Sequence, residues 1–171
     1  IRSIQTAEII FNIGFEKIIL NSYPLENPNI ISELARAFGS QSIIIAIDVK
    51  KNFFGKHETF SLSGTVNKKK KPAAWAQEVQ ELGAGEILLT SIDHEGTWKG
   101  FDLDLIKQVA DSVSIPVIAH GGAGNIEDIG EACNKGHASA VAVGSMVVYQ
   151  KQGMGVLVNF PDKNNLSKVI G

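Results

Sequence analysis

Residues 114–125 read SIPVIAHGGAGN, an apolar run that leads through a glycine-rich turn into the start of a helix. The run at 115–119 predicts a buried strand, and Asn125 with Asp128 three residues later predicts a capping box at a helix N-terminus. A strand joined to a helix in this way is half of a βαβ unit, which pairs its strands in parallel. The segment therefore predicts an α/β protein, and the rest of the chain repeats its order.

Short apolar runs and helical stretches alternate on both sides of this segment. Strands are predicted at 17–22, 43–49, 86–92, 115–119 and 139–144, and helices at 27–38, 72–82, 102–112 and from 125 onward. The run 43–49 is almost wholly apolar, as expected for a strand that is buried on both faces. Residues 52–66 interrupt the alternation with short segments that predict a loop or a β-hairpin.

Polar residues and prolines mark the predicted helix starts. Asn27 followed by Pro28 predicts an N-cap and then proline at the first helical position. Asp102 is the predicted N-cap of the helix that reaches to the neighbourhood of Ser112.

A weak internal repeat relates two segments of the chain. A shift of 122 residues aligns 1–23 with 123–145, and both segments run helix, glycine, apolar strand and small polar residues. Together with the alternation, the repeat predicts a (β/α)8 TIM barrel built from two similar halves. We expect residues 1–171 to form one partial barrel domain with roughly the last five to six βα units, the N-terminal units lying outside the sequence.

The overall composition excludes several functional classes. A net charge of −2 gives no basic field for nucleic acid, and no apolar span is long enough to cross a membrane. The single cysteine, Cys133, excludes a disulfide framework and indicates a reducing, cytoplasmic location. No cluster of histidine, cysteine and aspartate has metal-ligand spacing, so we expect no metal and no cofactor. The basic run 68–71 fits a solvated loop or, alternatively, a loop that grips phosphate.

Polar residues close the predicted strands, whereas the strand interiors are apolar. In a (β/α)8 barrel the active site lies at the carboxyl ends of the strands, while a doubly wound sheet would concentrate chemistry at a switch point. The strand-end residues are Asn21, Ser22, Asp48, Thr90, Ser91, Asp93, His120, Gly144 and Ser145.

Two glycine-containing segments predict a phosphate site. Gly121 and Gly122 open the run GGAG before a helix start, where backbone N–H groups and the helix dipole favour an anion. Gly144 and Ser145 end the following strand, and phosphate sites on the last two strands recur in this fold. The repeat places a second site at 21–22, so two sites would suit a long substrate with a phosphate at each end.

Asp48, which follows an apolar run, is the candidate for acid–base chemistry. A carboxylate there faces the barrel mouth or meets a heavy desolvation cost, and partial burial raises a carboxyl pKa toward the range of a general acid or base. A structural cap for the next loop is the alternative. Asp93 is expected either to stabilise its loop or to contact substrate. His120 is expected either to bond substrate or to have a structural role. The remaining histidines are expected at the surface: His57, His94 and His137.

Two charged residues stand at the opposite, amino-terminal ends of predicted strands. Lys17 opens KIILNS and Glu86 opens EILLTS. They fit either ordinary solvated strand ends or an ion-paired ring that closes the floor of the barrel.

Several runs resemble the cyclase subunit of imidazole glycerol phosphate synthase: IIIAIDVK (43–50), ELGAGEILLTSIDHEGT (81–97), SIPVIAHGGAGN (114–125) and AVAVGSM (140–146). The resemblance implies a phosphate-binding TIM barrel in a heterodimer with a glutaminase subunit. Ammonia from that partner reacts with a bisphosphorylated ribulosyl aminoimidazole carboxamide, a small phosphorylated substrate. The products are imidazole glycerol phosphate and an aminoimidazole carboxamide ribotide.

The resemblance also implies residue roles. Asp48 matches the catalytic aspartate on strand five, and the second aspartate, on strand one, is expected before residue 1. The other matches are Gly122, Gly144 and Ser145 for one phosphate, Asn21 and Ser22 for the other, Thr90 for a substrate contact, and Lys17 and Glu86 for an ammonia gate at the barrel floor.

The sequence departs from the family pattern at Glu95, where aspartate is usual, at His120, where serine is usual, and in the tail 147–163. Glu95 and His120 are candidate substrate contacts, and because of the departures the fold and the ammonia handling are expected to carry over better than the substrate does. These departures resemble a divergent branch associated with surface-polysaccharide genes and acetamidino sugars.

Four hypotheses follow from the sequence. They are the histidine-pathway cyclase, a cyclase-like ammonia-channelling partner in acetamidino sugar biosynthesis, a ribosylamino-imidazole isomerase of the same fold, and a non-catalytic binding module. The run GAGEILLTS and the pair Lys17 and Glu86 favour the ammonia-using proteins over the isomerase.

Overall fold

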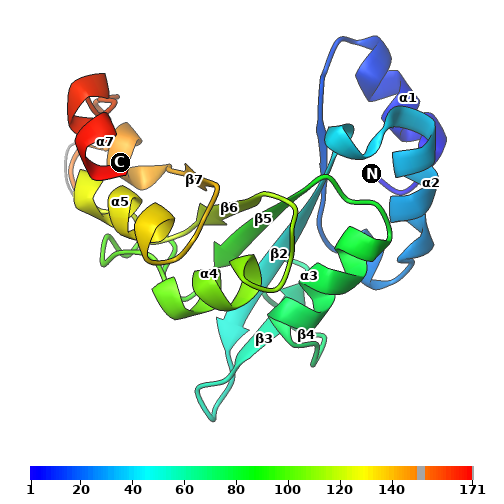
Figure 1. Ribbon diagram of the computed structural model, residues 1–171, viewed down its shortest axis with the longest axis horizontal. Coiled ribbons are helices and arrows are strands. Elements are labelled where there is room, and N and C mark those ends of the chain that lie inside the picture. Colours follow the sequence, from blue (N-terminus) through cyan, green and yellow to red (C-terminus); the bar gives the residue numbers. More distant parts are fainter. Residues whose placement is uncertain (150–152, 171) are drawn as a thin grey trace.

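A computed structural model of the protein, which describes residues 1–149 and 153–170, contains a parallel sheet (Figure 1). Its parallel strands are β1 Ile18–Leu20, β2 Ile43–Lys51, β5 Glu86–Ser91, β6 Val117–His120 and β7 Ala140–Ala142. They neighbour one another in chain order, β1-β2-β5-β6-β7. Residues 150–152 of the divergent tail lie outside the described residues.

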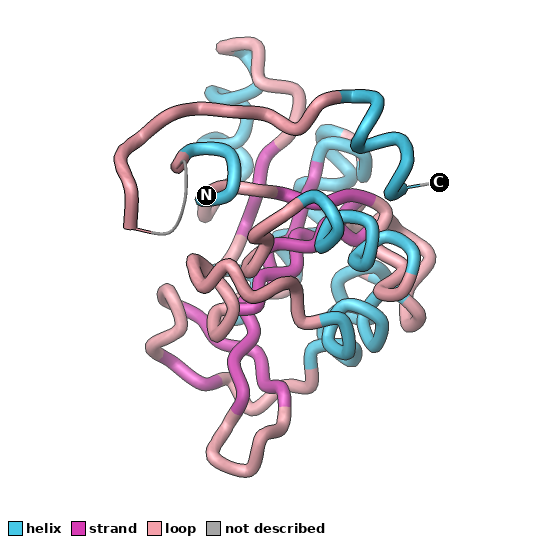
Figure 2. The backbone as a smooth tube through the Cα atoms, turned by 90° about the vertical axis from the view of Figure 1, so that its left-hand side faces the viewer, coloured by secondary structure: helices cyan, strands magenta, loops and turns pink. Residues whose placement is uncertain are grey.

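Helices connect the strands and pack against one face of the sheet. They are α1 Ile4–Asn12, α2 Asn29–Phe38, α3 Pro72–Glu81, α4 Leu103–Ala110, α5 Ile126–Asn134, α6 Ser145–Val148 and α7 Lys163–Ile170, with 3-10 helices η1 Tyr23–Leu25 and η2 Ser40–Ser42. In Figure 1, α3 and α4 lie in front of the sheet. The turned view of Figure 2 shows the strands running together beside this helical layer.

The predicted insertion after β2 is a β-hairpin. Strand β3 (His57–Ser61) runs antiparallel to the end of β2, with Phe60 opposite Asp48, and β4 (Val66–Asn67) pairs with β3. The hairpin projects from the sheet at the bottom of Figures 1 and 2. The alternative of a plain loop over 52–66 is therefore wrong for its strand-forming parts.

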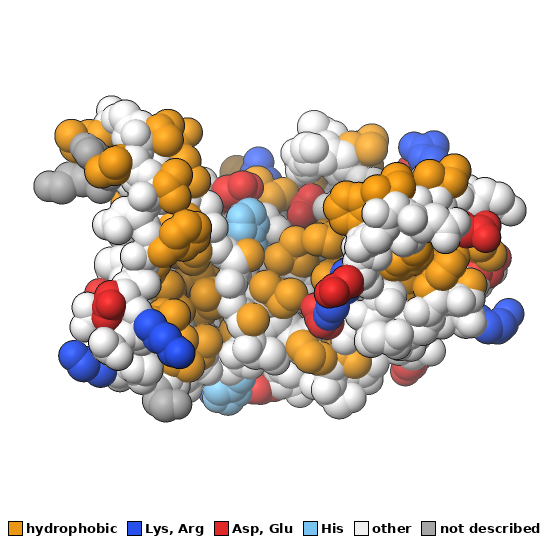
Figure 3. All heavy atoms as spheres, turned by 90° about the horizontal axis from the view of Figure 1, so that it is seen from above, with side chains coloured by type: hydrophobic (Ala, Val, Ile, Leu, Met, Phe, Trp, Pro, Cys, Tyr) orange, Lys and Arg blue, Asp and Glu red, His pale blue; other side chains and the backbone are white. Residues whose placement is uncertain are grey.

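Alternate residues of each strand point to opposite faces of the sheet. On β2 the residues toward the helices are Ile43, Ile45, Ile47 and Val49, none of them more than 1% exposed. Asp48 belongs to the other face, where the register sets it beside Thr90, His120 and Ala142 on successive strands. Figure 3 shows that one side of the molecule is hollowed and that hydrophobic side chains line the hollow.

The strand order confirms the predicted fold class. Parallel strands that neighbour one another in chain order, with helices on one face, are the arrangement of a (β/α)8 barrel. A doubly wound sheet would reverse its strand order at a switch point and carry helices on both faces. The described residues hold the part of the barrel that runs from β1 to β7.

The internal repeat is confirmed at the level of elements. A shift of 122 residues carries the bounds of α1 onto those of α5 and the bounds of β1 onto those of β7. It also carries the start of η1 at Tyr23 onto the start of α6 at Ser145. Each copy therefore ends in a short helical turn at the carboxyl end of its strand.

Two of the three predicted helix caps are confirmed. The Asp102 carboxylate accepts the N–H of Leu105, and Asn125 forms the capping box of α5. The predicted cap at Asn27 is wrong, because α2 begins one residue later, after Pro28, and no side chain caps it. The Asn27 amide instead donates to the Tyr23 hydroxyl at 3.4 Å, which links α2 to η1.

Among residues 1–149 and 153–170, every helix is too short or too polar to span a bilayer.

Candidate active site at the carboxyl ends of the strands

A row of three side chains crosses the carboxyl ends of β2, β5 and β6. Asp48, Thr90 and His120 occupy adjacent register positions on these strands. Thr90 Oγ1 lies 3.2 Å from His120 Nδ1, so the hydroxyl holds one nitrogen of the imidazole. The strands therefore bring a carboxyl, a hydroxyl and an imidazole together, as the positions of these residues in the sequence predict.

The Asp48 carboxyl is half-buried, and the groups around it shift its pKa in opposite directions. Burial is the largest effect and raises the pKa of Asp48 above its usual value. The amide of Asn21, which donates from Nδ2 to Asp48 Oδ2 at 2.9 Å, lowers the pKa, Glu95 raises it through charge repulsion, and His120 lowers it. The net direction is upward, which suits a group that exchanges a proton during catalysis.

A pocket of about 90 Å³ lies next to this row. It is lined by Glu95, Gly96, His120, Gly121, Gly122, Ala123, Ala142, Val143, Gly144 and Ser145. The two segments predicted to bind phosphate therefore line the same pocket. Both residues that depart from the family pattern, Glu95 and His120, face the same space.

The glycines of the GGAG turn allow a close approach to the loop at 92–100. A Cβ on Gly122 would overlap the carbonyl oxygen of Gly100, whose N–H donates to Gly122 O at 2.9 Å. Gly121 and Gly122 also have φ values of 93° and 117°, which side chains other than hydrogen disfavour. Packing against the end of β5 at Ser91 accounts for Gly121, and packing against this loop accounts for Gly122. These contacts also fix one wall of the pocket.

The N-terminus of α5 is already paired with a carboxylate. Asp128 accepts the N–H groups of Gly124 at 2.8 Å and of Asn125 at 3.2 Å. The expected anion site at this helix start is thus partly taken by the capping box. In α6, which begins at Ser145 beside the pocket, Val147 and Val148 donate their N–H groups to Gly144 O. The N–H groups of Ser145 and Met146 precede the first acceptor of the helix.

The second predicted phosphate site, at Asn21 and Ser22, lies on the other side of Asp48. Ser22 Oγ donates to Asn21 Oδ1 at 3.0 Å and accepts the N–H of Leu62 at 2.9 Å. Thr90 lies between the two predicted sites, on the strand next to β2. The two sites therefore flank the row of polar side chains.

Lys17 and Glu86 meet at the opposite end of the strands. Lys17 Nζ contacts Glu86 Oε1, so the ion pair predicted for the barrel floor is present. The floor is separated from the polar row by apolar side chains of the same face, which include Ile19, Ala46 and Leu88.

Asp93 lies apart from the pocket. Its Oδ2 accepts the backbone N–H of Lys51 at 2.8 Å, at the end of β2. This contact agrees with the loop-architecture alternative for Asp93, whereas Glu95, two residues later, lines the pocket.

A cluster around Asp102 escaped the sequence analysis. His57 Nε2 and Lys51 Nζ lie 3.0 and 3.1 Å from Asp102 Oδ2, and His94 Nε2 lies 3.8 Å from it. The surface placement predicted for His57 and His94 is therefore wrong, because both rings are largely covered by this cluster. His137 is exposed as predicted. The cluster joins the turn end of the β2–β3 hairpin, where Lys51 pairs with His57, to the loop that forms the pocket wall.

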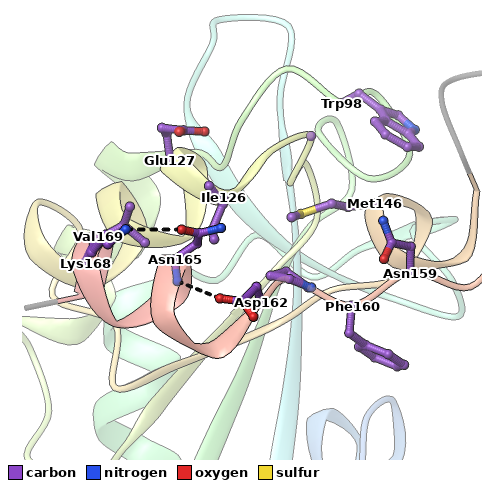
Figure 4. Close-up of a pocket in the computed structure, with 12 residues that line it drawn as sticks. Trp98, Ile126, Glu127, Met146, Asn159, Phe160, Asp162, Asn165, Lys168 and Val169 are labelled. Atoms are coloured by element: carbon purple, nitrogen blue, oxygen red, sulfur yellow. Dashed lines mark hydrogen bonds between the residues drawn. The ribbon is translucent and has the colours of Figure 1, made fainter.

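A larger hollow of about 640 Å³ lies outside the strand ends, between α5 and the segment that leads into α7 (Figure 4). Trp98, Met146 and Phe160 are among its apolar lining residues, and Glu127 and Lys168 are among its charged ones. It contains none of the residues of the polar row. Within the described parts of the chain, no group of three or more His, Cys, Asp or Glu residues is arranged to hold a metal ion.

Comparison with known proteins gives one family and several relatives. A family model described as "Histidine biosynthesis protein" matches residues 1–153. The imidazole glycerol phosphate synthase subunits HisF of Prochlorococcus marinus and Alkaliphilus metalliredigens are 42% and 40% identical over 98% and 88% of this chain. The HisF subunit of Pyrobaculum aerophilum is 48% identical over 85% of it. The chain spans 66%, 60% and 57% of the lengths of these three relatives.

Proposed function

This chain belongs to the family of histidine biosynthesis proteins, and we propose that it acts as the cyclase subunit of an imidazole glycerol phosphate synthase. One observation carries the proposal: the carboxyl of Asp48 stands in a row with Thr90 and His120, beside the pocket formed by the two glycine segments. The chain covers about two thirds or less of the lengths of the relatives compared above, and the activity of a whole cyclase subunit is therefore a proposal for this chain.

Asp48 is the proposed general acid–base group. Its half-buried position raises the pKa of the carboxyl, so protonated and ionised forms lie closer in free energy than for an exposed aspartate. Thr90 and His120 are the proposed substrate contacts beside it, with Glu95 facing the same pocket. Asp93 is not assigned a substrate contact, because its carboxylate is bonded to the backbone of Lys51.

The two ends of the substrate would lie on either side of this row. Gly121, Gly122, Gly144 and Ser145 line the hollow proposed for one phosphate, where backbone N–H groups at the start of α6 favour an anion. Residues 21–22 at the end of β1 are proposed for the second phosphate, and the repeat that relates η1 to α6 supports this assignment.

The floor of the barrel is the proposed entrance for ammonia. The Lys17–Glu86 ion pair closes the amino-terminal ends of β1 and β5, and apolar side chains separate it from Asp48. A glutaminase subunit that docks at this end would deliver ammonia to the floor. The described relatives are themselves named as subunits, which supports a heterodimer. We place this complex in the cytoplasm.

Turnover of the bisphosphorylated ribulosyl aminoimidazole carboxamide with free ammonium tests the proposal. The full-length protein should form imidazole glycerol phosphate and aminoimidazole carboxamide ribotide, and Asp48→Asn should abolish product formation. Asp104→Asn, an exposed aspartate on α4, is the matched control and should retain wild-type turnover.

Other outcomes would identify the competing functions. Isomerised product without any ammonium requirement would indicate a ribosylamino-imidazole isomerase. Tight binding of the bisphosphate without turnover would indicate a binding module. No binding, together with ammonium-dependent conversion of a sugar, would indicate the acetamidino branch.

A further inference from the structure

The side chains of Asn21 and Ser22 are engaged with protein groups at the barrel mouth. Asn21 Nδ2 donates to Asp48 Oδ2 at 2.9 Å, and Ser22 Oγ donates to Asn21 Oδ1 at 3.0 Å. Ser22 Oγ in turn accepts the backbone N–H of Leu62 at 2.9 Å. Three hydrogen bonds thus form a continuous path from Leu62 to the proposed acid.

All donors along this path point toward Asp48. A carboxylate only accepts, so the Asn21 nitrogen must face Asp48 and its oxygen must face Ser22. The Ser22 hydroxyl has a single hydrogen, which it gives to Asn21, and it receives the Leu62 hydrogen on a lone pair. Hydrogen bonds aligned in one direction polarise one another, and here they favour negative charge on the final acceptor.

The start of the path is a constrained turn. Leu62 and Ser63 connect β3 to β4 with φ values of 51° and 55°, a region that residues with side chains rarely adopt. Thr65 closes the turn by donating from Oγ1 to Leu62 O at 2.7 Å. The bond from Leu62 N–H to Ser22 is the contact that ties this turn to β1.

We propose that Asn21 and Ser22 are positioning residues that couple the β3–β4 turn to the orientation and charge of Asp48. When the turn leaves Ser22, the path loses its first donor and the carboxylate loses part of the stabilisation of its charge. Any ligand that displaces the turn therefore alters the acid. This inference rests on the role of Asp48 under the proposed function, but the coupling itself is a property of the folded chain.

The charged groups that face Asp48 from other elements are Glu95, in the loop after β5, and His120, on β6. Variants at 21 and 22 leave both unchanged. The Asn21 hydrogen bond lowers the pKa of Asp48, against the larger effect of burial, which raises it. Loss of this hydrogen bond should therefore raise the pKa of Asp48.

A carbon-13 NMR titration of aspartate carboxyls in the full-length protein, with Asp48 assigned through Asp48→Asn, tests the coupling. Asn21→Ala should raise the pKa of Asp48 above the wild-type value, and Ser22→Ala should raise it by less. Ser22→Thr keeps the hydroxyl and should restore the wild-type titration. Asn27→Ala removes a nearby asparagine that bonds Tyr23 instead and should have no effect.

Amide hydrogen exchange reports the other end of the path. Ser22→Ala should speed exchange at Leu62 by about fivefold, the effect of one ordinary hydrogen bond, whereas Ser22→Thr should not. An unmoved Asp48 titration in Asn21→Ala, even with a higher KM for the bisphosphate, would mean that these side chains serve the phosphate alone and would overturn the coupling. If the variants show these shifts but the wild-type protein has no cyclase turnover, the proposed function is refuted and the coupling remains intact.

Discussion

At the scale of the residue, two covered carboxylates have opposite pKa shifts for identifiable reasons. Burial dominates at Asp48, where one asparagine is the hydrogen-bonding partner, and the pKa is raised. Burial is also the largest effect at Asp102, but hydrogen bonds from His57, the Leu105 N–H and Lys51 together outweigh it, so the pKa is lowered. These opposite pKa shifts suit a reactive acid at Asp48 and a carboxylate at Asp102 that stays ionised and holds its partners in place.

Replacing Asp102 by alanine should lower the free energy of unfolding by about 2–4 kcal/mol, because it removes a helix cap and leaves the partly covered ammonium group of Lys51 unpaired. The lowered pKa of Asp102 means that its stabilisation is complete above the unfolded-chain value of about 3.9 and is lost as the pH falls through the folded value. Urea denaturation at several pH values should therefore show the wild-type advantage shrinking in acid. Asp104→Ala, on the same helix but exposed, should cost no more than about 0.5 kcal/mol.

At the scale of the element, periodicity and local chemistry account for what the sequence predicted. The short apolar run at 43–47, rich in isoleucine, favours a buried strand, and the caps at Asp102 and Asn125 depend on groups within three residues. The Asp102 cluster could not be predicted, because His57 reaches it through the hairpin and His94 through a separate loop. Likewise, nothing local distinguishes Asn21 as a partner of Asp48, 27 residues away.

The two glycine segments should respond differently to an added methyl group. Gly122→Ala should lower the free energy of unfolding by about 2–3 kcal/mol, because φ is 117° and the new Cβ would overlap the Gly100 carbonyl. A Cβ added at Gly144 would have no heavy atom within 4 Å, so Gly144→Ala should change the free energy of unfolding by less than about 1 kcal/mol. Equal losses in urea denaturation would show that close packing does not explain Gly122.

At the scale of the whole molecule, the fold places two different groups of polar side chains at the two ends of the strands. The polar row and pocket lie at the carboxyl ends, and the ion pair of Lys17 and Glu86 lies at the amino-terminal ends. The sequence predicted both groups from strand order alone, since each residue opens or closes a strand. Their roles in binding and ammonia entry stay predictions, because position in a barrel does not by itself identify a ligand.

The floor pair therefore gives a test that separates structure from function. The side chains of Lys17 and Glu86 are 43% and 21% exposed, and ion pairs in such surroundings contribute about 0–1 kcal/mol, so Glu86→Gln should unfold almost as the wild type does. If the pair gates ammonia, the ratio of glutamine-dependent to ammonium-dependent turnover should fall in the complex with the glutaminase. Glu81→Gln, exposed at the end of α3, is the matched control and should keep the wild-type ratio. An unchanged ratio in Glu86→Gln would reduce the pair to a solvated contact between two strand ends, because a gate must affect the ammonia that passes it.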